Sequence, residues 1–152
     1  MSASVRSACP GDALATGRIL FEFQQGTDWM PKLYTLEEVV RFCAIMIERG
    51  WVTVAQDQRR VVGFLARDRD EVCSLYLAAD VRGRGFGRAL LADAKSASPR
   101  LVLRTVEANE AAQRFYHRQG FIEIERGDGS ANEEGLPDIT YHWVEGTTGD
   151  QA

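Results

Sequence analysis

The sequence has no long apolar run and no excess of positive charge. No stretch of its 152 residues approaches the roughly 18 consecutive apolar residues that cross a membrane as a helix. The segment "MSASVRSACPGD" at the start lacks the apolar core of a secretory signal peptide. The formal net charge is -4 at pH 7, whereas a general nucleic-acid or anionic-membrane surface needs a basic face. We therefore expect a cytoplasmic protein without nucleic-acid or membrane partners.

Cysteine is also scarce. Cys9, Cys43 and Cys73 are odd in number and widely spaced, without a CxxC pair or a neighbouring histidine suited to zinc. We predict three reduced thiols, mostly buried as small hydrophobic side chains, and no metal site.

No internal repeat or low-complexity linker divides the chain, and 45% of its residues are hydrophobic. This suits one domain with its own core, predicted over 1–146 and followed by a disordered tail over 147–152. Periodicity predicts strands over 4–8, 51–56, 61–68, 71–79, 100–106, 121–126 and 138–144. It predicts helices over 11–24, from Leu36 to a stop at Gly50 with a capping box at Thr35 and Glu38, over 85–97 and over 109–119. The order βααβββαβαββ favours an α/β or α+β fold.

The segment "RGRGFGRALL" (82–91) places glycines at alternate positions between arginines, just before a predicted helix. Arg88 breaks the G-x-G-x-x-G pattern, and no Gly-Lys-Ser/Thr follows for a Walker A loop. The first N–H groups of a helix lack partners within the helix and attract anions. Glycines let the backbone approach a diphosphate, and Arg82, Arg84 and Arg88 add positive charge. A flexible turn with solvated arginines is the alternative.

The stretch "LYLAADVRGRGFGRALL" (75–91) resembles motif A of the GCN5-related N-acetyltransferase (GNAT) superfamily, whose core is Arg/Gln-x-x-Gly-x-Gly/Ala. The stretch "TVEANEAAQRFYHRQGF" (105–121) resembles motif B of the same superfamily. Ala79 departs from the pattern, because many relatives carry proline there. The resemblance covers essentially the whole predicted domain and implies a mixed, mostly antiparallel sheet of the seven predicted strands, flanked by the four predicted helices. The matching residues are Arg82, Gly85 and Gly87 in motif A, and Asn109, Ala112, Phe115, Tyr116, Gly120 and Phe121 in motif B.

This resemblance implies an N-acetyltransferase that moves the acetyl group of acetyl-CoA to a primary amine of a small molecule or peptide, by direct attack in a ternary complex. It implies that Asn109 contacts the pantetheine arm, that Tyr116 is the general acid for the leaving thiolate, and that the Leu77 amide faces the acetyl group. On an ideal helix Asn109 and Tyr116 would point within roughly 20° of each other. Without the motifs, a lone helical tyrosine there is usually a packing residue. The implied cofactor contacts are Leu75, Leu77, Arg82, Gly83, Arg84, Gly85, Phe86, Gly87, Arg88, Asn109, Ala112, Phe115 and Tyr116.

The attacking amine must be neutral. A lysine-like amine of pKa about 10.4 is neutral at pH 7 in roughly one molecule in 2,500, so a base would help, whereas an α-amino group near pKa 8 needs little help. Glu71 is the candidate base, because it begins the central strand and shares the alternation of Leu75 and Leu77. A solvated glutamate at a strand edge is the alternative. His142 is a second candidate, although a lone histidine is more often structural or exposed.

The sequence does not name the acceptor. Trp29 and Tyr34 lie between the first two helices, where they could line an acceptor pocket or cap the core. The loop "GDGSANEEGLPD" (127–138) is acidic and would attract a cationic amine, unless it is an ordinary solvated loop.

The oligomeric state and the function each have alternatives. Members of the superfamily that the chain resembles often pair through their C-terminal strands, and here Ile139, Tyr141 and Trp143 alternate along the last strand. The resemblance therefore implies a possible homodimer, unless these side chains face the protein's own core. A non-catalytic acyl-CoA-binding module is the alternative function, and Tyr116 argues against it. An interaction domain that has lost the cofactor is a third reading, and the intact residues of motif A argue against that.

Overall fold

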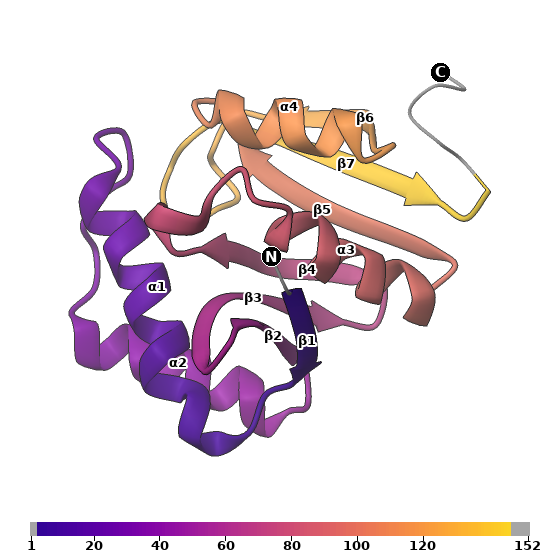
Figure 1. The fold of residues 1–152 in the computed structure, drawn as a ribbon. Helices are drawn as coiled ribbons and strands as arrows, with labels where there is room; N and C mark the ends of the chain where they lie inside the picture. The colour runs from indigo at the N-terminus through magenta and orange to yellow at the C-terminus, as the bar shows by residue number, and fades with distance from the viewer. Residues whose placement is uncertain (1–2, 147–152) are drawn as a thin grey trace. The chain divides into compact units, whose positions relative to one another are not determined.

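The computed structural model describes residues 3–146, and the predicted element order is confirmed (Figure 1). Seven strands form one hydrogen-bonded sheet in the order β1-β2-β3-β4-β5-β7-β6. The chain packs as two compact units, of which the first runs to Asp68 and includes Cys73–Ala94, and the second combines Arg69–Val72 with the chain from Lys95. A single domain over 1–146 stays a prediction. The predicted tail over 147–152 lies outside the described residues.

The first unit places two neighbouring helices on its strands. β1 pairs with β2, and β2 with β3, both antiparallel, and β4 follows β3 in the sheet order. Helix α1 packs against α2 and β3. The core includes Val54, Val62 and Phe64, which are fully buried. The elements are β1 (Ala3–Ser7), α1 (Ala13–Gly26), α2 (Leu36–Glu48), β2 (Val52–Asp57), β3 (Arg60–Asp68), the Cys73–Leu77 part of β4 (Glu71–Leu77), and most of α3 (Phe86–Ala97).

Local signals fix both ends of α2. The Thr35 hydroxyl accepts from the Glu38 N–H at 3.2 Å, and the Glu38 carboxylate accepts from the Thr35 N–H at 2.9 Å, which confirms the predicted capping box. At the other end Gly50 has φ +78°, a left-handed conformation that glycine adopts without strain. The Trp51 N–H donates to the Met46 carbonyl at 3.2 Å and closes a Schellman motif.

The second unit consists mainly of the later strands and helix α4. Its strands pair antiparallel except at the start of β4, where Glu71 lies opposite Val102 in a parallel pair. The mixed, mostly antiparallel sheet is therefore confirmed. The unit contains the start of β4, β5 (Arg100–Val106), α4 (Glu110–Arg118), β6 (Ile122–Gly127) and β7 (Asp138–Val144).

The face of β7 that suggested a dimer is buried in the protein itself. Ile139 is 0% exposed, and Tyr141 and Trp143 are each 6% exposed. The alternative is correct, because these side chains alternate onto the same side as Leu101 and Leu103 of the paired strand β5. They offer no surface for a second copy, and the homodimer loses its supporting argument.

The cysteine prediction is partly wrong. All three thiols are free of disulfides, and Cys43 is buried, but Cys9 and Cys73 are exposed. Cys9 lies in the turn before the short 3₁₀ helix Pro10–Asp12. Cys73 alternates on β4 with the buried Val72 and Ser74, so its side chain points to the opposite face.

Asp12 is a buried carboxylate that joins β1 to the start of α1. It accepts two bonds from the Arg6 guanidinium, at 2.8 and 3.0 Å, and one from the Cys9 N–H at 2.8 Å. The bonds from Arg6 are the main cause that lowers the pKa of Asp12 to about 2. Bidentate Arg–carboxylate pairs are among the stronger hydrogen-bonded contacts in proteins.

We predict that Asp12→Asn lowers the free energy of unfolding by about 1 to 2 kcal/mol at pH 7. The folded-state pKa lies below the unfolded value of about 3.9, so this stabilisation is present above that pH and is lost as pH falls toward 2. Urea unfolding at pH 7 and near pH 2 measures it, and the two proteins should converge at the lower pH. Asp80→Asn is the control, because its pair with Arg60 is exposed and should contribute little. Equal losses in the two variants would contradict the prediction.

Candidate functional site

The glycine–arginine segment forms a loop between β4 and α3 in the first unit. After β4 the chain makes a 3₁₀ turn at Ala79–Val81, and then passes through Gly83 and Gly85 with φ of +81° and +92°. Both values are in the left-handed region that disfavours residues with a Cβ. Val81 and Phe86 are fully buried on either side of the loop. The alternating glycines therefore allow the left-handed backbone that the loop adopts between two buried side chains.

The start of α3 presents amide groups at this loop. The first helical bond runs from the Ala89 N–H to the Gly85 carbonyl at 3.0 Å. The preceding amides of Phe86, Gly87 and Arg88 have no acceptor within the helix. They are the backbone donors that the sequence predicted for an anion.

Two arginines of the loop are oriented by residues from distant segments. Arg84 contacts the Asp57 carboxylate at 3.3 Å, and its guanidinium lies 5.5 Å from the Phe86 ring centroid. Arg82 donates to the Leu77 carbonyl at 3.5 Å and lies 5.8 Å from the Phe23 ring centroid. Both arginine residues are exposed and can present N–H groups to a phosphate. The sequence does not identify Phe23 or Asp57 as parts of the site, because no local pattern links them to the loop.

The end of β4 depends on a glycine of the neighbouring strand. A Cβ at Gly63 would collide with the Leu77 side chain and lie 3.1 Å from the Tyr76 carbonyl oxygen. Leu75 and Leu77 are half-buried there. The sequence does not identify Gly63 either, since a single glycine within a strand pattern indicates only a bulge or a close approach.

Of the two predicted acceptor residues, one is packed and one is exposed. The Trp29 ring lies edge-on to Phe23 with 6.2 Å between centroids, and Phe23 packs on Tyr76 of β4 at 5.1 Å. Trp29 therefore joins an aromatic cluster that also holds Arg82. Tyr34 is 36% exposed.

In the second unit Asn109 caps α4. The helix begins at Glu110, and the Asn109 Oδ1 accepts from the Ala112 N–H at 3.1 Å. Its φ and ψ of -87° and 77° are not helical. The expectation that Asn109 and Tyr116 share one helical face was therefore wrong, since helical periodicity does not extend to the cap. Asparagine before a helical pattern is a common N-cap signal.

Tyr116 is buried among aromatic rings. It is the buried residue of α4 and is 7% exposed. Its ring centroid lies 5.2 Å from that of Phe115, 5.5 Å from Phe121 and 6.2 Å from Tyr141. These contacts hold the ring in one place, as both a packing role and a catalytic role require.

The two candidate bases lie in one row of the second unit's sheet. Val102 of β5 is opposite both Glu71 and His142. Glu71 is half-exposed, and its carboxylate contacts Arg104 at 3.3 Å. At about 3.3 Å per residue, the six residues from Glu71 to Leu77 span about 20 Å of strand. Glu71 stays a candidate base, and for an amine bound near Leu77 it would have to act through intervening water rather than by direct contact.

The acidic loop between β6 and β7 is organised around Asn132. Its side chain accepts from the Leu136 N–H at 3.2 Å and donates to the Leu136 carbonyl at 2.8 Å. The adjoining Pro137 carbonyl accepts from the Glu107 N–H at 2.7 Å, close to the Asn109 cap. The loop is therefore braced against the segment that begins α4.

The described part of the chain holds neither a cluster of metal-ligating side chains nor a membrane-spanning helix. Among residues 3–146 there is no group of three or more His, Cys, Asp or Glu side chains suited to a metal ion. Within the same range no helix is both long and apolar enough to cross a membrane.

We predict that Gly83→Ala disrupts the loop whereas Gly26→Ala does not. Both positions leave open space for a Cβ, but only Gly83 has positive φ, so the pair isolates the backbone requirement. Gly83→Ala should lower the free energy of unfolding by about 1 to 2 kcal/mol, or weaken acetyl-CoA binding by a similar free energy if the loop alone is disturbed. Urea unfolding and calorimetric titration with acetyl-CoA measure the two effects. Unfolding curves and titrations that match those of Gly26→Ala would show that the left-handed backbone is unimportant.

Known proteins are similar to this chain in sequence and in fold. A family model described as an acetyltransferase (GNAT) domain matches residues 48–123. The peptidyl-lysine N-acetyltransferases YjaB of Salmonella typhimurium and Escherichia coli are 37% and 38% identical over 71 residues, which are 47% of this chain and 48% of each relative. The match thus spans about half the length of these curated relatives.

Solved structures agree over more of the chain. The solution structure of apo-form YjaB from Escherichia coli has a TM-score of 0.80 and 26% identity, and covers 95% of this chain and 99% of that one. YncA from Salmonella typhimurium, solved with its cofactor acetyl-CoA, has a TM-score of 0.72 and 20% identity over 95% and 94% of the two chains, and shows the fold alone. With the family model matched across both motifs, the chain belongs to the GCN5-related N-acetyltransferase (GNAT) family.

Proposed function

We propose that this protein is an acetyl-CoA-dependent N-acetyltransferase whose acceptor is the side-chain amine of a peptide lysine. The observation that carries the proposal is the loop of Gly83 and Gly85, whose left-handed backbone presents amides and arginines between two buried anchors. Such a loop fits a diphosphate, because anions bind helix N-termini and arginine N–H groups. The lysine acceptor is taken from the printed activity of the YjaB relatives.

The cofactor supplies an acetyl thioester. In the proposed reaction the neutral amine attacks the thioester carbonyl, the C–S bond breaks, and CoA leaves as a thiolate that takes up a proton. The backbone amide of Leu77 is proposed to face the developing oxyanion. Tyr116 is proposed as the proton donor, and its three ring contacts would keep the phenol in place.

A lysine acceptor places a demand on the site. At pH 7 keeping its amine neutral costs about 4.6 kcal/mol, so a proton acceptor is needed. The sequence suggests Glu71 as the base. Glu71 contacts Arg104, however, and lies at the first residue of β4, whereas Leu77 is the last. A base elsewhere, or solvent, would then take the proton from an amine held at Leu77. An α-amino acceptor would need only about 1 kcal/mol and no dedicated base.

An acceptor panel tests the proposal. Three peptides of one sequence should be compared with acetyl-CoA: one with a lysine and a blocked N-terminus, one with arginine in its place, and one with arginine and an open N-terminus. We expect CoA thiol release and a mass gain of one acetyl group with the lysine peptide alone. Acetylation of the open N-terminus alone would show that the acceptor is an α-amino group and not a lysine side chain. Acetyl-CoA binding without thiol release from any amine would favour the non-catalytic module.

We predict that Tyr116→Phe lowers turnover at least tenfold, because general acid catalysis is typically worth about 10² to 10⁴ in rate. The ring and its packing remain, so acetyl-CoA affinity and the melting temperature should barely change. Tyr141→Phe is the matched control, since Tyr141 is buried in the same aromatic cluster and lies outside both motifs.

Rates should be taken where the chemical step limits turnover. Unchanged turnover in Tyr116→Phe would show that Tyr116 is not the general acid. Loss of folding and CoA affinity together would mark Tyr116 as a packing residue.

A further inference from the structure

Lysine is almost absent from this protein. Of its 18 lysine and arginine residues only Lys32 and Lys95 are lysines. Both amines are held by backbone carbonyls, but their surroundings differ. Lys32 is exposed, and its Nζ donates to the Thr27 and Met30 carbonyls at 2.7 and 3.0 Å.

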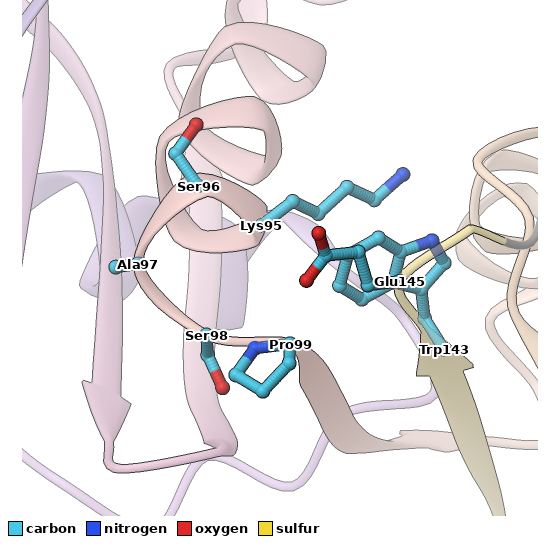
Figure 2. A pocket seen from close by; sticks show the side chains of 7 residues that line it. All are labelled: Lys95, Ser96, Ala97, Ser98, Pro99, Trp143 and Glu145. Atoms are coloured by element: carbon cyan, nitrogen blue, oxygen red, sulfur yellow. The ribbon is translucent and has the colours of Figure 1, made fainter.

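Lys95 is half-buried in the last turn of α3, within the second unit. Its Nζ donates to the Gln119 carbonyl at 2.7 Å. It lies 5.1 Å from the Trp143 ring centroid and 5.8 Å from that of Phe121. Figure 2 shows the Lys95 side chain extended beside the Trp143 indole. One carbonyl and two aromatic rings thus surround the amine.

The amine is reachable, and its partial burial favours the neutral form. A pocket of about 360 Å³ opens beside it (Figure 2), lined by Lys95, Ser96, Ala97, Ser98, Pro99, Trp143 and Glu145. Burial lowers the pKa of Lys95, although Glu145 lines the same pocket. A neutral amine keeps two N–H groups, one of which can still donate to Gln119, and gains a lone pair. An uncharged lysine nitrogen is the nucleophile in acyl transfer.

We propose that Lys95 is an acetylation site of this protein, modified directly by acetyl-CoA that enters the pocket beside it. The Nζ lone pair attacks the thioester carbonyl and forms an N–C bond, the C–S bond breaks, and the amine proton passes to water as CoA leaves. This reaction does not use Tyr116, so it is independent of the proposed function.

The product would alter the end of α4. An acetylated Lys95 keeps one N–H for the Gln119 carbonyl but loses its charge over Trp143 and Phe121. Gln119 is the C-cap of α4, and its N–H donates to the Phe115 and Tyr116 carbonyls at 3.0 and 3.1 Å. Phe121 also packs edge-on against Tyr116. Acetylation would thus weaken the contacts that hold the turn next to Tyr116.

Mass spectrometry with isotopically labelled acetyl-CoA tests the site, and Lys32 serves as a control within the same chain. We expect the full-length folded protein to gain label at Lys95 several-fold faster than at Lys32. In concentrated guanidinium chloride the two rates should become equal, because both amines then have the ordinary pKa of lysine. A folded-state ratio at or below one would overturn the proposal.

The variant Tyr116→Phe separates direct from enzymatic modification. Unchanged labelling at Lys95 supports the direct reaction. Slower labelling would overturn it in favour of transfer catalysed by the enzyme itself. The peptide panel reports on the proposed function independently of either result.

Two variants test the consequence of acetylation. Lys95→Gln removes the charge as acetylation does, whereas Lys95→Arg keeps it. We expect Lys95→Gln to lower the melting temperature by about 2 to 4 °C, the size of shift expected for losing one such contact in a chain of this length. Lys95→Arg should lie closer to the parent protein. Equal melting temperatures for the two variants would overturn the link between charge at Lys95 and the end of α4.

Discussion

The candidate site depends on a backbone constraint: the chain must turn through two left-handed positions between a strand end and a helix start. Gly83 and Gly85 meet it, and the buried Val81 and Phe86 fix the turn on either side. Side chains with a Cβ resist this conformation because the Cβ approaches the following carbonyl. The position of the backbone amides that could receive a phosphate follows from this local geometry.

The arginines of that loop are directed by partners that are distant in sequence. Phe23 of α1 lies beneath the guanidinium of Arg82, and Asp57 at the end of β2 contacts Arg84. A planar guanidinium can stack on a ring and still donate hydrogen bonds to an anion in its plane. Arginine therefore combines orientation with binding here, which a lysine ammonium would do less well.

In the second unit both ends of α4 are tied to neighbouring elements. Asn109 caps its first turn, and the Glu107 N–H is bonded to the loop that Asn132 organises. At the other end Lys95 holds the Gln119 carbonyl. Tyr116 lies between these two sets of contacts. A shift at either end of α4 can therefore move the Tyr116 ring through backbone hydrogen bonds and ring contacts.

The sequence by itself determined the order of elements, the two ends of α2, the loop before α3 and the family, because these depend on signals that act within a few residues. Alternation predicted that one side of β7 is apolar, but only the tertiary structure decided that Ile139, Tyr141 and Trp143 belong to the protein's own core. It likewise decided that Asn109 caps a helix, that Cys73 faces outward, and which residues contact Arg82, Arg84 and Lys95. The physical reason is that burial and pairing depend on what the distant parts of the chain bring to a residue, and no local pattern records that.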